Sequence, residues 1–288
     1  MISGGAGAIE RAAVLGSGTM GHGIAQVLAM AGIRTCVYDV ASTALDQARA
    51  KVRANLEQGV EKGKVTPAVR DSALGLLDYT TDLRRATDDC HVVIEAVPEK
   101  LELKRGLFAE LGRLSAETLL ATNTSSLSIT KIASAAAHPS RVVGMHFFNP
   151  VHVMKLVEVV RAEQSARSAI DLALGLATRL GKDPIEVADA PGFASSRLGI
   201  AIGLEAIRMV EAGVASAADI DKAMTLGYGF PMGPLRLTDL VGLDVRLSIA
   251  EYLAKELGER FTPPQLLRDK VARGELGKKS GRGFYDWP

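Results

Sequence analysis

Residues 12–21, AAVLGSGTMG, decide the fold of the first half of the chain. An apolar run passes directly into the pattern G-x-G-x-x-G, whose glycines are Gly16, Gly18 and Gly21. An apolar stripe then predicts a helix over residues 23–33. In such a unit the first glycine permits a tight turn, the second lets a pyrophosphate approach the backbone, and the third lets helix and strand pack closely. The stretch therefore predicts a dinucleotide site at the start of a helix.

Asp39 completes this unit. It follows a second predicted strand, residues 35–38, and lies eighteen residues beyond Gly21. A carboxylate about 20 residues after the glycines bonds a ribose 2′-hydroxyl in sites of this kind. Because a carboxylate would repel a 2′-phosphate, Asp39 predicts NAD and not NADP as the cofactor. Thr19 and Met20 lie inside the glycine loop and belong to the same candidate cofactor site.

Length and composition narrow the class of protein. A chain of 288 residues is long enough for about two domains, and 47% hydrophobic with 23% charged residues is typical of globular folds. The 34 basic and 33 acidic residues nearly balance, so the chain has no large net positive charge that would attract nucleic acid or an anionic membrane. We therefore expect neither partner. Cys36 and Cys90 make no disulfide framework, which fits a reducing cytosol.

One segment resembles a membrane span in hydropathy alone. Residues 12–33 contain no Asp, Glu, Lys or Arg, but the glycine cluster and His22 argue against a span. Residues 1–8 lack the basic segment that begins a signal peptide. We therefore expect a cytoplasmic protein without a membrane segment.

A polar stretch follows one of the predicted strands of the sheet. Residues 91–97 and 118–122 read as buried parallel strands, with a helix over residues 100–114 between them. Residues 123–126, Asn-Thr-Ser-Ser, come at the end of the second of these strands. Ligands of open parallel sheets lie beyond the carboxyl ends of the strands, so a ligand contact fits this position. A cap for a helix over residues 127–133 fits it equally well, and the residues leave both interpretations open.

A histidine and a glutamate are predicted to face each other across a hairpin. Strands are expected over residues 141–147 and 155–160, and an antiparallel hairpin centred near His152 places His146 opposite Glu158. A carboxylate in that position holds the imidazole ring and stabilises its protonated form, which supports a catalytic base. A lone histidine at a strand end is usually structural. The carboxylate and the neighbouring cofactor site favour catalysis here.

The helix that follows Asp39 has one basic face. Its apolar stripe extends as far as Gly63, and the opposite side carries Arg49, Lys51, Arg53 and Lys62. A solvated surface explains such a face, and a contact for a polyanionic substrate tail is the alternative.

The pattern of alternating strands and helices ends at residues 189–192, Asp-Ala-Pro-Gly, after a helix over 165–180 and a strand over 184–188. We therefore predict an α/β protein of two domains. Residues 1–190 form a Rossmann-type dinucleotide-binding domain, and residues 191–288 form an all-helical domain for substrate binding and dimerisation. Helices of the second domain are expected over residues 198–210, 216–227, 235–240 and 243–257 and after the prolines at 263–264.

Two segments of the second domain suggest where it packs. Residues 198–210 are apolar almost all round, so we expect this helix to be buried on more than one side and to form a homodimer contact. The tail, residues 277–287, is basic and rich in glycine, which fits a solvated terminus. Its aromatic residues Phe284, Tyr285 and Trp287 favour docking instead.

Seven blocks in order carry a resemblance that runs from about Ile9 to Trp287. The chain resembles the L-3-hydroxyacyl-CoA dehydrogenase family. The resemblance implies reversible oxidation of an L-3-hydroxyacyl-CoA to the 3-ketoacyl-CoA, with NAD as hydride acceptor and a short-chain substrate, 3-hydroxybutyryl-CoA. NAD is the only cofactor expected, and no metal site is expected. The blocks are GSGTMGHGIA, VIEAVPE, ATNTSSLSI, GMHFFNP followed by MKLVEVV, APGFASSR, MGPLRLTDLVGLD and GKKSGRGFYDW.

The resemblance also assigns roles to single residues. His146 matches the general base of the family and Glu158 its acidic partner, while Ser125 and Asn149 match residues that hold the substrate near the nicotinamide. Further matches to NAD contacts are Asp39, Glu99, Lys104 and Lys279, with Ser125 and Asn149 also beside the cofactor.

The remaining matches concern the substrate. Asn55 and Lys62 align with positions that touch the CoA moiety. The family usually has Asn before Arg after Pro-Gly-Phe, whereas APGFASSR has Ser196 there. This difference leaves the reaction class intact and puts the substrate contact of the second domain in question.

Two other functions compete with this one. A dehydrogenase of the same architecture that acts on a free hydroxy acid or sugar acid is the nearest. A non-catalytic NAD-binding structural protein is the second, and the set of His146, Glu158, Ser125 and Asn149 argues against it.

Overall fold

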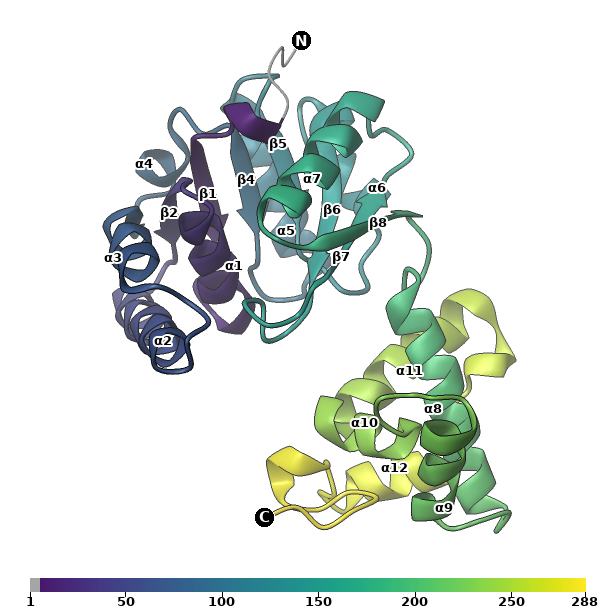
Figure 1. Ribbon diagram of the computed structural model, residues 1–288. Coiled ribbons are helices and arrows are strands. Elements are labelled where there is room, and N and C mark those ends of the chain that lie inside the picture. Colours follow the sequence, from purple (N-terminus) through teal and green to yellow (C-terminus); the bar gives the residue numbers. More distant parts are fainter. Residues whose placement is uncertain (1–5) are drawn as a thin grey trace. The chain divides into compact units, whose positions relative to one another are not determined.

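Eight strands form a single sheet in the order β3-β2-β1-β4-β5-β6-β7-β8 (Figure 1). The structure is a computed structural model that describes residues 6–288, so the expectation for residues 1–8 lies largely outside the described part of the chain. All neighbouring strands are parallel except β6 and β7. The strands are β1 (Arg11–Leu15), β2 (Arg34–Tyr38), β3 (Leu77–Thr80), β4 (Val92–Glu95), β5 (Leu119–Thr122), β6 (Val142–Phe147), β7 (Leu156–Arg161) and β8 (Asp183–Ala188).

Helices connect these strands and cover the sheet. In Figure 1, α1 and α7 lie on the face toward the viewer, and apolar residues of both helices join those of the strands in the largest core cluster. The helices of this part of the chain are α1 (Thr19–Met30), α2 (Ser42–Glu61), α3 (Pro67–Gly75), α4 (Leu83–Thr87), α5 (Leu101–Glu110), α6 (Ile129–Ala133) and α7 (Arg167–Arg179), with short 3₁₀ turns η1 (Ala6–Ala8), η2 (Leu111–Arg113) and η3 (Pro139–Arg141).

The parallel sheet with its helices confirms the predicted Rossmann-type fold. The strands and helices expected between residues 12 and 61 and between 91 and 188 are present, with ends that differ by a few residues. The sequence pattern indicated no element at α3, β3 or α4. β3 is an edge strand with a single buried residue, Thr80, so it lacks the apolar run that reveals the buried strands.

The antiparallel pair β6–β7 has the predicted register. His146 is paired with Glu158, between the pairs Met145–Val159 and Phe147–Val157. Both side chains therefore point to the same face of the sheet, because cross-strand partners share a face.

The chain divides into two compact units, Met1–Ala190 and Pro191–Pro288. The second unit is helical, as predicted, and its helices α8, α10 and α11 pack on one another. Its elements are α8 (Ser195–Glu211), α9 (Ala217–Lys222), a π-helical turn η4 (Ala223–Gly227), α10 (Pro234–Val241), α11 (Leu243–Leu257), α12 (Gln265–Ala272), and the 3₁₀ turns η5 (Glu259–Phe261) and η6 (Lys278–Ser280).

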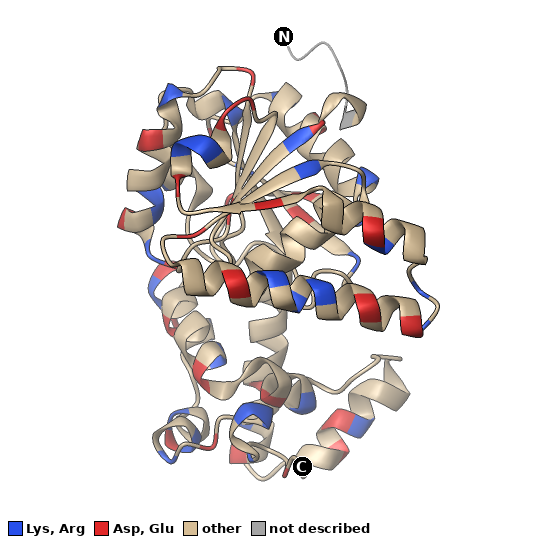
Figure 2. Cartoon of the chain, turned by 90° about the vertical axis from the view of Figure 1, so that its left-hand side faces the viewer, with Lys and Arg blue, Asp and Glu red and all other residues tan. Residues whose placement is uncertain are grey.

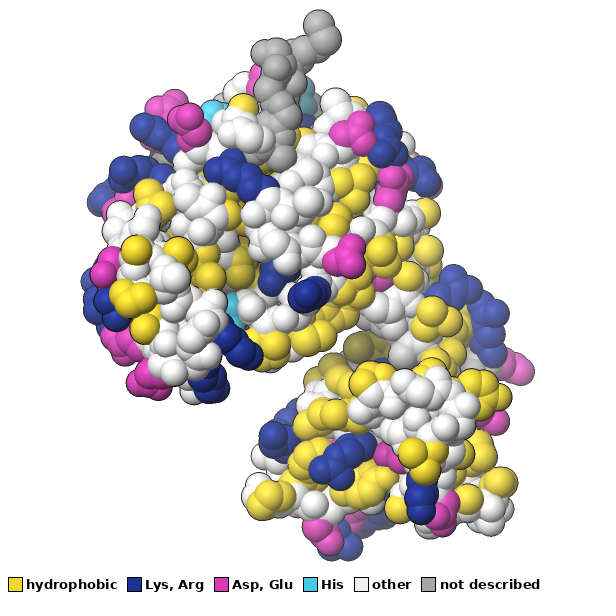
Figure 3. Space-filling model, viewed as in Figure 1, with side chains coloured by type: hydrophobic (Ala, Val, Ile, Leu, Met, Phe, Trp, Pro, Cys, Tyr) yellow, Lys and Arg dark blue, Asp and Glu magenta, His cyan; other side chains and the backbone are white. Residues whose placement is uncertain are grey.

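Helix α8 buries one broad face and leaves part of its apolar surface exposed. Ile200, Leu204 and Ile207 belong to the core of the second unit. Leu198 is 63% exposed and Ile202 37% exposed. The expectation that this helix is buried on more than one side is therefore wrong within this chain, since these two side chains remain at the surface. Other apolar residues of this unit are also exposed, as Figure 3 shows.

The C-terminal tail docks on α10. The amides of Phe284 and Tyr285 donate to the buried carboxylate of Asp239 at 2.8 and 2.9 Å, and the indole nitrogen of Trp287 donates to it at 2.8 Å. A side chain on Gly283 would collide with the same carboxylate. The aromatic residues thus indicated the behaviour of this tail correctly, and a solvated terminus is excluded.

Within residues 6–288, no helix is both long enough and apolar enough to cross a membrane.

Candidate active site

The glycine loop between β1 and α1 is built for close approach. Gly16 has a φ of +97°, and a Cβ there would lie 2.6 Å from the carbonyl oxygen of Ala96. A Cβ on Gly21 would collide with the carbonyl of Gly16. A Cβ on Gly18 would meet nothing within 4 Å, and no side chain caps α1 at this residue. Gly16 and Gly21 are thus required by the fold, while Gly18 leaves open space at amides that suit a phosphate.

Asp39 is fixed at the end of β2, next to this loop. Its Oδ2 accepts hydrogen bonds from the amide and hydroxyl of Ser17 at 2.9 and 2.7 Å, and its Oδ1 accepts one from the amide of Ala41 at 3.2 Å. Burial raises the pKa of Asp39, but these hydrogen bonds outweigh burial and hold the pKa below its ordinary value. The side chain is therefore a carboxylate at neutral pH.

A cavity of about 540 Å³ opens beside Asp39. Gly16 and Asp39 line one part of it, and Val97, Leu103 and Gly106 line another. A carboxylate at the rim of a partly apolar cavity suits a nucleoside, whose base packs on apolar side chains while its ribose meets the acid.

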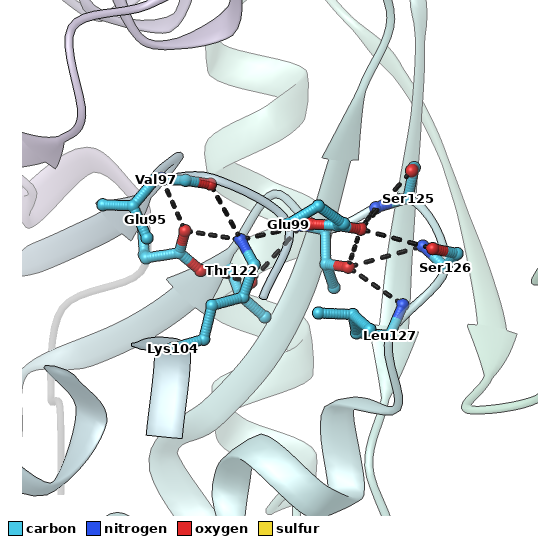
Figure 4. Close-up of polar contacts among 9 residues, drawn as sticks. Glu95, Val97, Glu99, Lys104, Thr122, Ser125, Ser126 and Leu127 are labelled. Carbon is cyan, nitrogen blue, oxygen red and sulfur yellow. Dashed lines mark hydrogen bonds and ion pairs between the residues drawn. The ribbon is translucent and has the colours of Figure 1, made fainter. Parts of the chain in front are cut away.

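A buried ion pair lies at the end of β4 (Figure 4). The Lys104 ammonium, on α5, is 2.6 Å from Glu95 Oε1, at the end of β4, and 3.3 Å from the carbonyl oxygen of Val97. The hydroxyl of Thr122 donates to Glu95 Oε2 at 2.6 Å, and the amide of Val97 donates to Oε1 at 2.7 Å. Burial raises the pKa of Glu95, and Lys104 and these hydrogen bonds oppose that rise. The expected cofactor residue Lys104 therefore lies in the interior of the unit.

Glu99 joins this pair to the polar stretch after β5 (Figure 4). One carboxylate oxygen is 3.3 Å from the Lys104 ammonium. The other accepts from the hydroxyl of Thr124, from the amide of Ser125 at 3.0 Å, and from the hydroxyl of Ser126 at 3.4 Å. Glu99 thus fixes the loop that carries Ser125.

The structure excludes one of the two interpretations of residues 123–126, the cap of α6. The N-cap of α6 is Ser128, whose hydroxyl accepts from the amide of Lys131 at 3.2 Å, so the polar stretch is not the cap of that helix. Asn123 instead accepts a hydrogen bond from the amide of Phe147 at 2.9 Å and ties the ends of β5 and β6 together.

His146 and Glu158 form a close, buried pair. The Nδ1 atom of His146 lies 2.7 Å from Glu158 Oε2, and the histidine ring is 4.5 Å from that of Phe148. A neutral imidazole that donates through Nδ1 carries its lone pair on Nε2, which can accept a proton. This geometry provides a proton acceptor whose ring is oriented by a carboxylate. Asn149 follows in the next loop, is exposed, and precedes a cis peptide bond to Pro150.

The expected CoA residues lie on α2 and just after it. Asn55 is partly buried, and its amide donates to the side chain of Gln26 at 3.2 Å. Lys62 is exposed at the C-cap of the helix. Arg49 stacks on the ring of Tyr79 at 4.8 Å. Figure 2 shows acidic as well as basic residues along α2, so the helix presents both signs of charge.

The remaining expected residues belong to the second unit. Ser196 is the second residue of α8. The Lys279 ammonium lies 2.5 and 2.6 Å from the two carboxylate oxygens of Asp244.

The structure thus joins Glu99, Lys104 and Ser125 in one network, and His146 and Glu158 in a pair. The sequence did not single out Glu95, and it named Asn123 only as part of the polar stretch at residues 123–126. A glutamate inside the apolar run of β4 was the available signal for the first, because a charge is rarely buried without a partner.

Comparisons with known proteins identify the family of both units. The 3-hydroxyacyl-CoA dehydrogenase NAD-binding domain matches residues 11–190, and the C-terminal domain of 3-hydroxyacyl-CoA dehydrogenase matches residues 192–287. A 3-hydroxybutyryl-CoA dehydrogenase of Mycobacterium tuberculosis is 47% identical over 97% of this chain and 99% of its own length. A 3-hydroxyadipyl-CoA dehydrogenase of Escherichia coli is 43% identical over 97% of this chain and 59% of its own length.

A solved structure gives the same result for the fold. The crystal structure of (S)-3-hydroxybutyryl-CoA dehydrogenase PaaH1 from Ralstonia eutropha is 37% identical and has a TM-score of 0.93, covering 98% of this chain and 100% of the other. The chain belongs to the 3-hydroxyacyl-CoA dehydrogenase family, and its cofactor is NAD.

Proposed function

We propose that this protein is an NAD-dependent dehydrogenase that interconverts 3-hydroxybutyryl-CoA and acetoacetyl-CoA, with His146 as the general base. The observation that carries the proposal is the 2.7 Å contact between His146 and Glu158. These residues belong to the same sheet as β1, the strand that leads into the glycine loop. Relatives across nearly the whole chain are named 3-hydroxybutyryl-CoA dehydrogenases, which supports this substrate.

The mechanism assigns one proton to His146. Bound NAD supplies the hydride acceptor for C3 of the substrate. His146 accepts the proton of the 3-hydroxyl through Nε2, and Glu158 stabilises the imidazolium that forms. In the reverse direction the imidazolium returns the proton to the 3-keto oxygen. General base catalysis of this kind contributes about 10²–10⁴-fold.

The cofactor is held by residues at the strand ends. The glycine loop, including Thr19 and Met20, holds the pyrophosphate, and Asp39 binds the adenosine ribose. Glu99 and Lys104 contribute to the cofactor site indirectly, by fixing the loop that carries Ser125. Their polar atoms already bind each other and that loop. Lys279 is a further cofactor contact from the second unit.

Ser125 and Asn149 orient the thioester near the nicotinamide, and Ser196 adds a contact from α8. Asn55 and Lys62 bind the CoA moiety, for which an exposed cation at the end of α2 is suited.

The test is a spectrophotometric assay of the purified protein with NADH. We expect oxidation of NADH with acetoacetyl-CoA and little or none with free acetoacetate. A preference for the free acid would replace this proposal with the alternative of a free hydroxy acid dehydrogenase. Binding of NADH without turnover of either compound would leave the non-catalytic alternative.

We also propose a homodimer that forms through the helical unit in the cytoplasm. Leu198 and Ile202 expose apolar surface on α8 that a second copy would bury. Light scattering at micromolar concentration should give twice the mass of one chain. A monomer at that concentration would contradict the dimer.

A further inference from the structure

A cavity of the first unit is lined by basic side chains. It has a volume of about 310 Å³ and lies between the end of α1, the hairpin loop that joins β6 to β7, and the turn between α7 and β8. His152, Lys155, Arg179 and Lys182 line it, and none of its described lining residues is Asp or Glu. Clefts lined by one sign of charge concentrate ions of the opposite sign, so this cavity favours an anion.

The lysines at this cavity have no carboxylate partner. The Lys182 ammonium donates to the carbonyl oxygens of Val151 and Met154, which are neutral groups. Within residues 6–288 the Lys155 ammonium forms no hydrogen bond or ion pair. Asp183, the nearest acid along the chain, is exposed and forms no ion pair in the same part of the chain. An anion in the cavity would therefore meet two lysines whose charge no carboxylate balances.

Further basic groups lie close to His152. Partial burial lowers the pKa of His152, and the neighbouring Lys182, His22 and Lys64 lower it further. His22 belongs to the first turn of α1 and Lys64 follows α2, so segments distant in the sequence bring positive charge to the same place. Figure 3, seen from the side of α1 and α7, shows basic side chains and a histidine on this part of the first unit. A neutral His152 can donate a hydrogen bond to an anion, and a bound anion would favour its protonated form.

A short series of contacts connects the cavity to an expected CoA residue. Asn55, on α2, donates to the side chain of Gln26, on α1, at 3.2 Å. The Gln26 amide in turn lies 3.8 Å from the sulfur of Met30, and Met30 lines the cavity. Lys62, the other expected CoA residue, follows α2 and precedes Lys64 by two residues. A CoA moiety held by Asn55 and Lys62 would therefore lie next to this cavity, and all of these residues belong to the first unit.

The charge and the size of the cavity select one part of CoA. CoA carries a diphosphate bridge and a separate 3′-phosphate on its ribose. Only the 3′-phosphate is a monoester, which approaches a dianion at neutral pH and suits two lysines without a balancing acid. Val27, Met30 and Leu180 line the same cavity and suit the apolar face of the adjoining nucleoside. A volume of about 310 Å³ is at the low end for ligand sites, which fits such a terminal fragment and not the whole of CoA.

We propose that this cavity binds the 3′-phosphate of the CoA moiety, with Lys155 and His152 in contact with the phosphate and Lys182 as a fixed positive charge beside them. This inference rests on the proposed function, because it takes a CoA thioester as the substrate. The ammonium of Lys155 binds the phosphate as a point charge. The site contributes to the affinity for CoA and takes no part in the hydride or proton transfer.

The experiment measures the dissociation constants of CoA and 3′-dephospho-CoA, which differ only in this phosphate. The wild-type protein should bind CoA about tenfold or more tightly. Lys155→Gln should reduce this preference about five- to tenfold, the low end for a hydrogen bond to a charged group, because Lys155 is exposed to water. Lys155→Arg keeps the charge and should retain most of the preference. Lys131→Gln removes an exposed lysine of α6 and should leave the preference unchanged.

Competition binding distinguishes two sources of the phosphate. Adenosine 3′,5′-bisphosphate should displace CoA more strongly than adenosine 5′-monophosphate, and Lys155→Gln should remove this difference. Inorganic phosphate that binds in a manner dependent on Lys155 while CoA remains bound would indicate an independent phosphate site and would overturn the assignment to CoA.

Binding and turnover together separate this inference from the proposed function. A preference for CoA over 3′-dephospho-CoA that depends on Lys155 supports the site even if no CoA thioester is turned over, in which case the proposed activity alone fails. If acetoacetyl-CoA is reduced but the wild type binds the two compounds equally, or Lys155→Gln weakens both equally, the site is overturned and the proposed function stands. Failure to bind either compound overturns both.

Discussion

Lys104 of the first unit and Arg246 of the second are both buried cations, and their surroundings differ. Lys104 in the first unit is 1% exposed and lies among oxygens of Glu95, Val97 and Glu99. Arg246 in the second unit is nearly as buried and has no partner among the described residues. A buried charge whose partners are all present belongs to the scaffold of a site. A buried charge without a partner instead lowers the stability of the fold.

The largest effect expected from this comparison is on stability. Lys104→Met should lower the free energy of unfolding by about 3–5 kcal/mol, because it leaves the Glu95 carboxylate buried without its cation. Urea denaturation measures the change. Lys100→Met, which alters an exposed residue just before the same helix, should change stability by no more than about 0.5 kcal/mol.

Arg246→Met should instead raise the free energy of unfolding, because it removes a buried charge that no partner compensates. If Lys104→Met and Arg246→Met destabilised the protein equally, the two cations would be structural equivalents, and the distinction drawn between them would be wrong.

A smaller effect is expected at the carboxylate of Asp39. Asp39→Ala should lower the preference for NAD over NADP, expressed as the ratio of kcat/KM values, by about tenfold or more. The change removes both a hydrogen bond to the ribose and the repulsion of a 2′-phosphate. Steady-state kinetics with both cofactors test this, and an unchanged ratio would show that Asp39 does not select the cofactor.

The smallest effect is expected at Ser196. A serine hydroxyl reaches less far than the asparagine usual in the family, and a neutral hydrogen bond contributes about 1 kcal/mol. Ser196→Ala should therefore lower kcat/KM about tenfold or less, while Asn149→Ala should lower it distinctly more. Equal losses in two variants of equal thermal stability would make Ser196 a full substrate contact.

Local patterns were enough to predict much of the fold. The glycine loop, Asp39 and the buried strands each follow from residues that are neighbours in the sequence. The facing pair His146–Glu158 followed from a short hairpin, since a register depends on few residues. The edge strand β3 could not be found in this way, because its single buried residue leaves no period to detect.

Contacts between site residues that are distant in the sequence could not be predicted from the sequence. Lys104 matches a cofactor contact by resemblance, yet its depth in the interior depends on how α5 packs against β4. The lack of a polar partner for Arg246 among the described residues likewise depends on how α8, α10 and α11 pack together. The absence of a partner cannot be read from a one-dimensional pattern.

The role of His146 as the general base can be tested with a single variant. In His146→Ala, kcat for reduction of acetoacetyl-CoA and the dissociation constant of NADH are determined on the same folded preparation. We expect kcat to fall by about 10²–10⁴-fold while NADH binding changes little, because His146 acts on the substrate proton and the glycine loop holds the cofactor. Undiminished turnover in that variant would contradict the role of His146 as the general base.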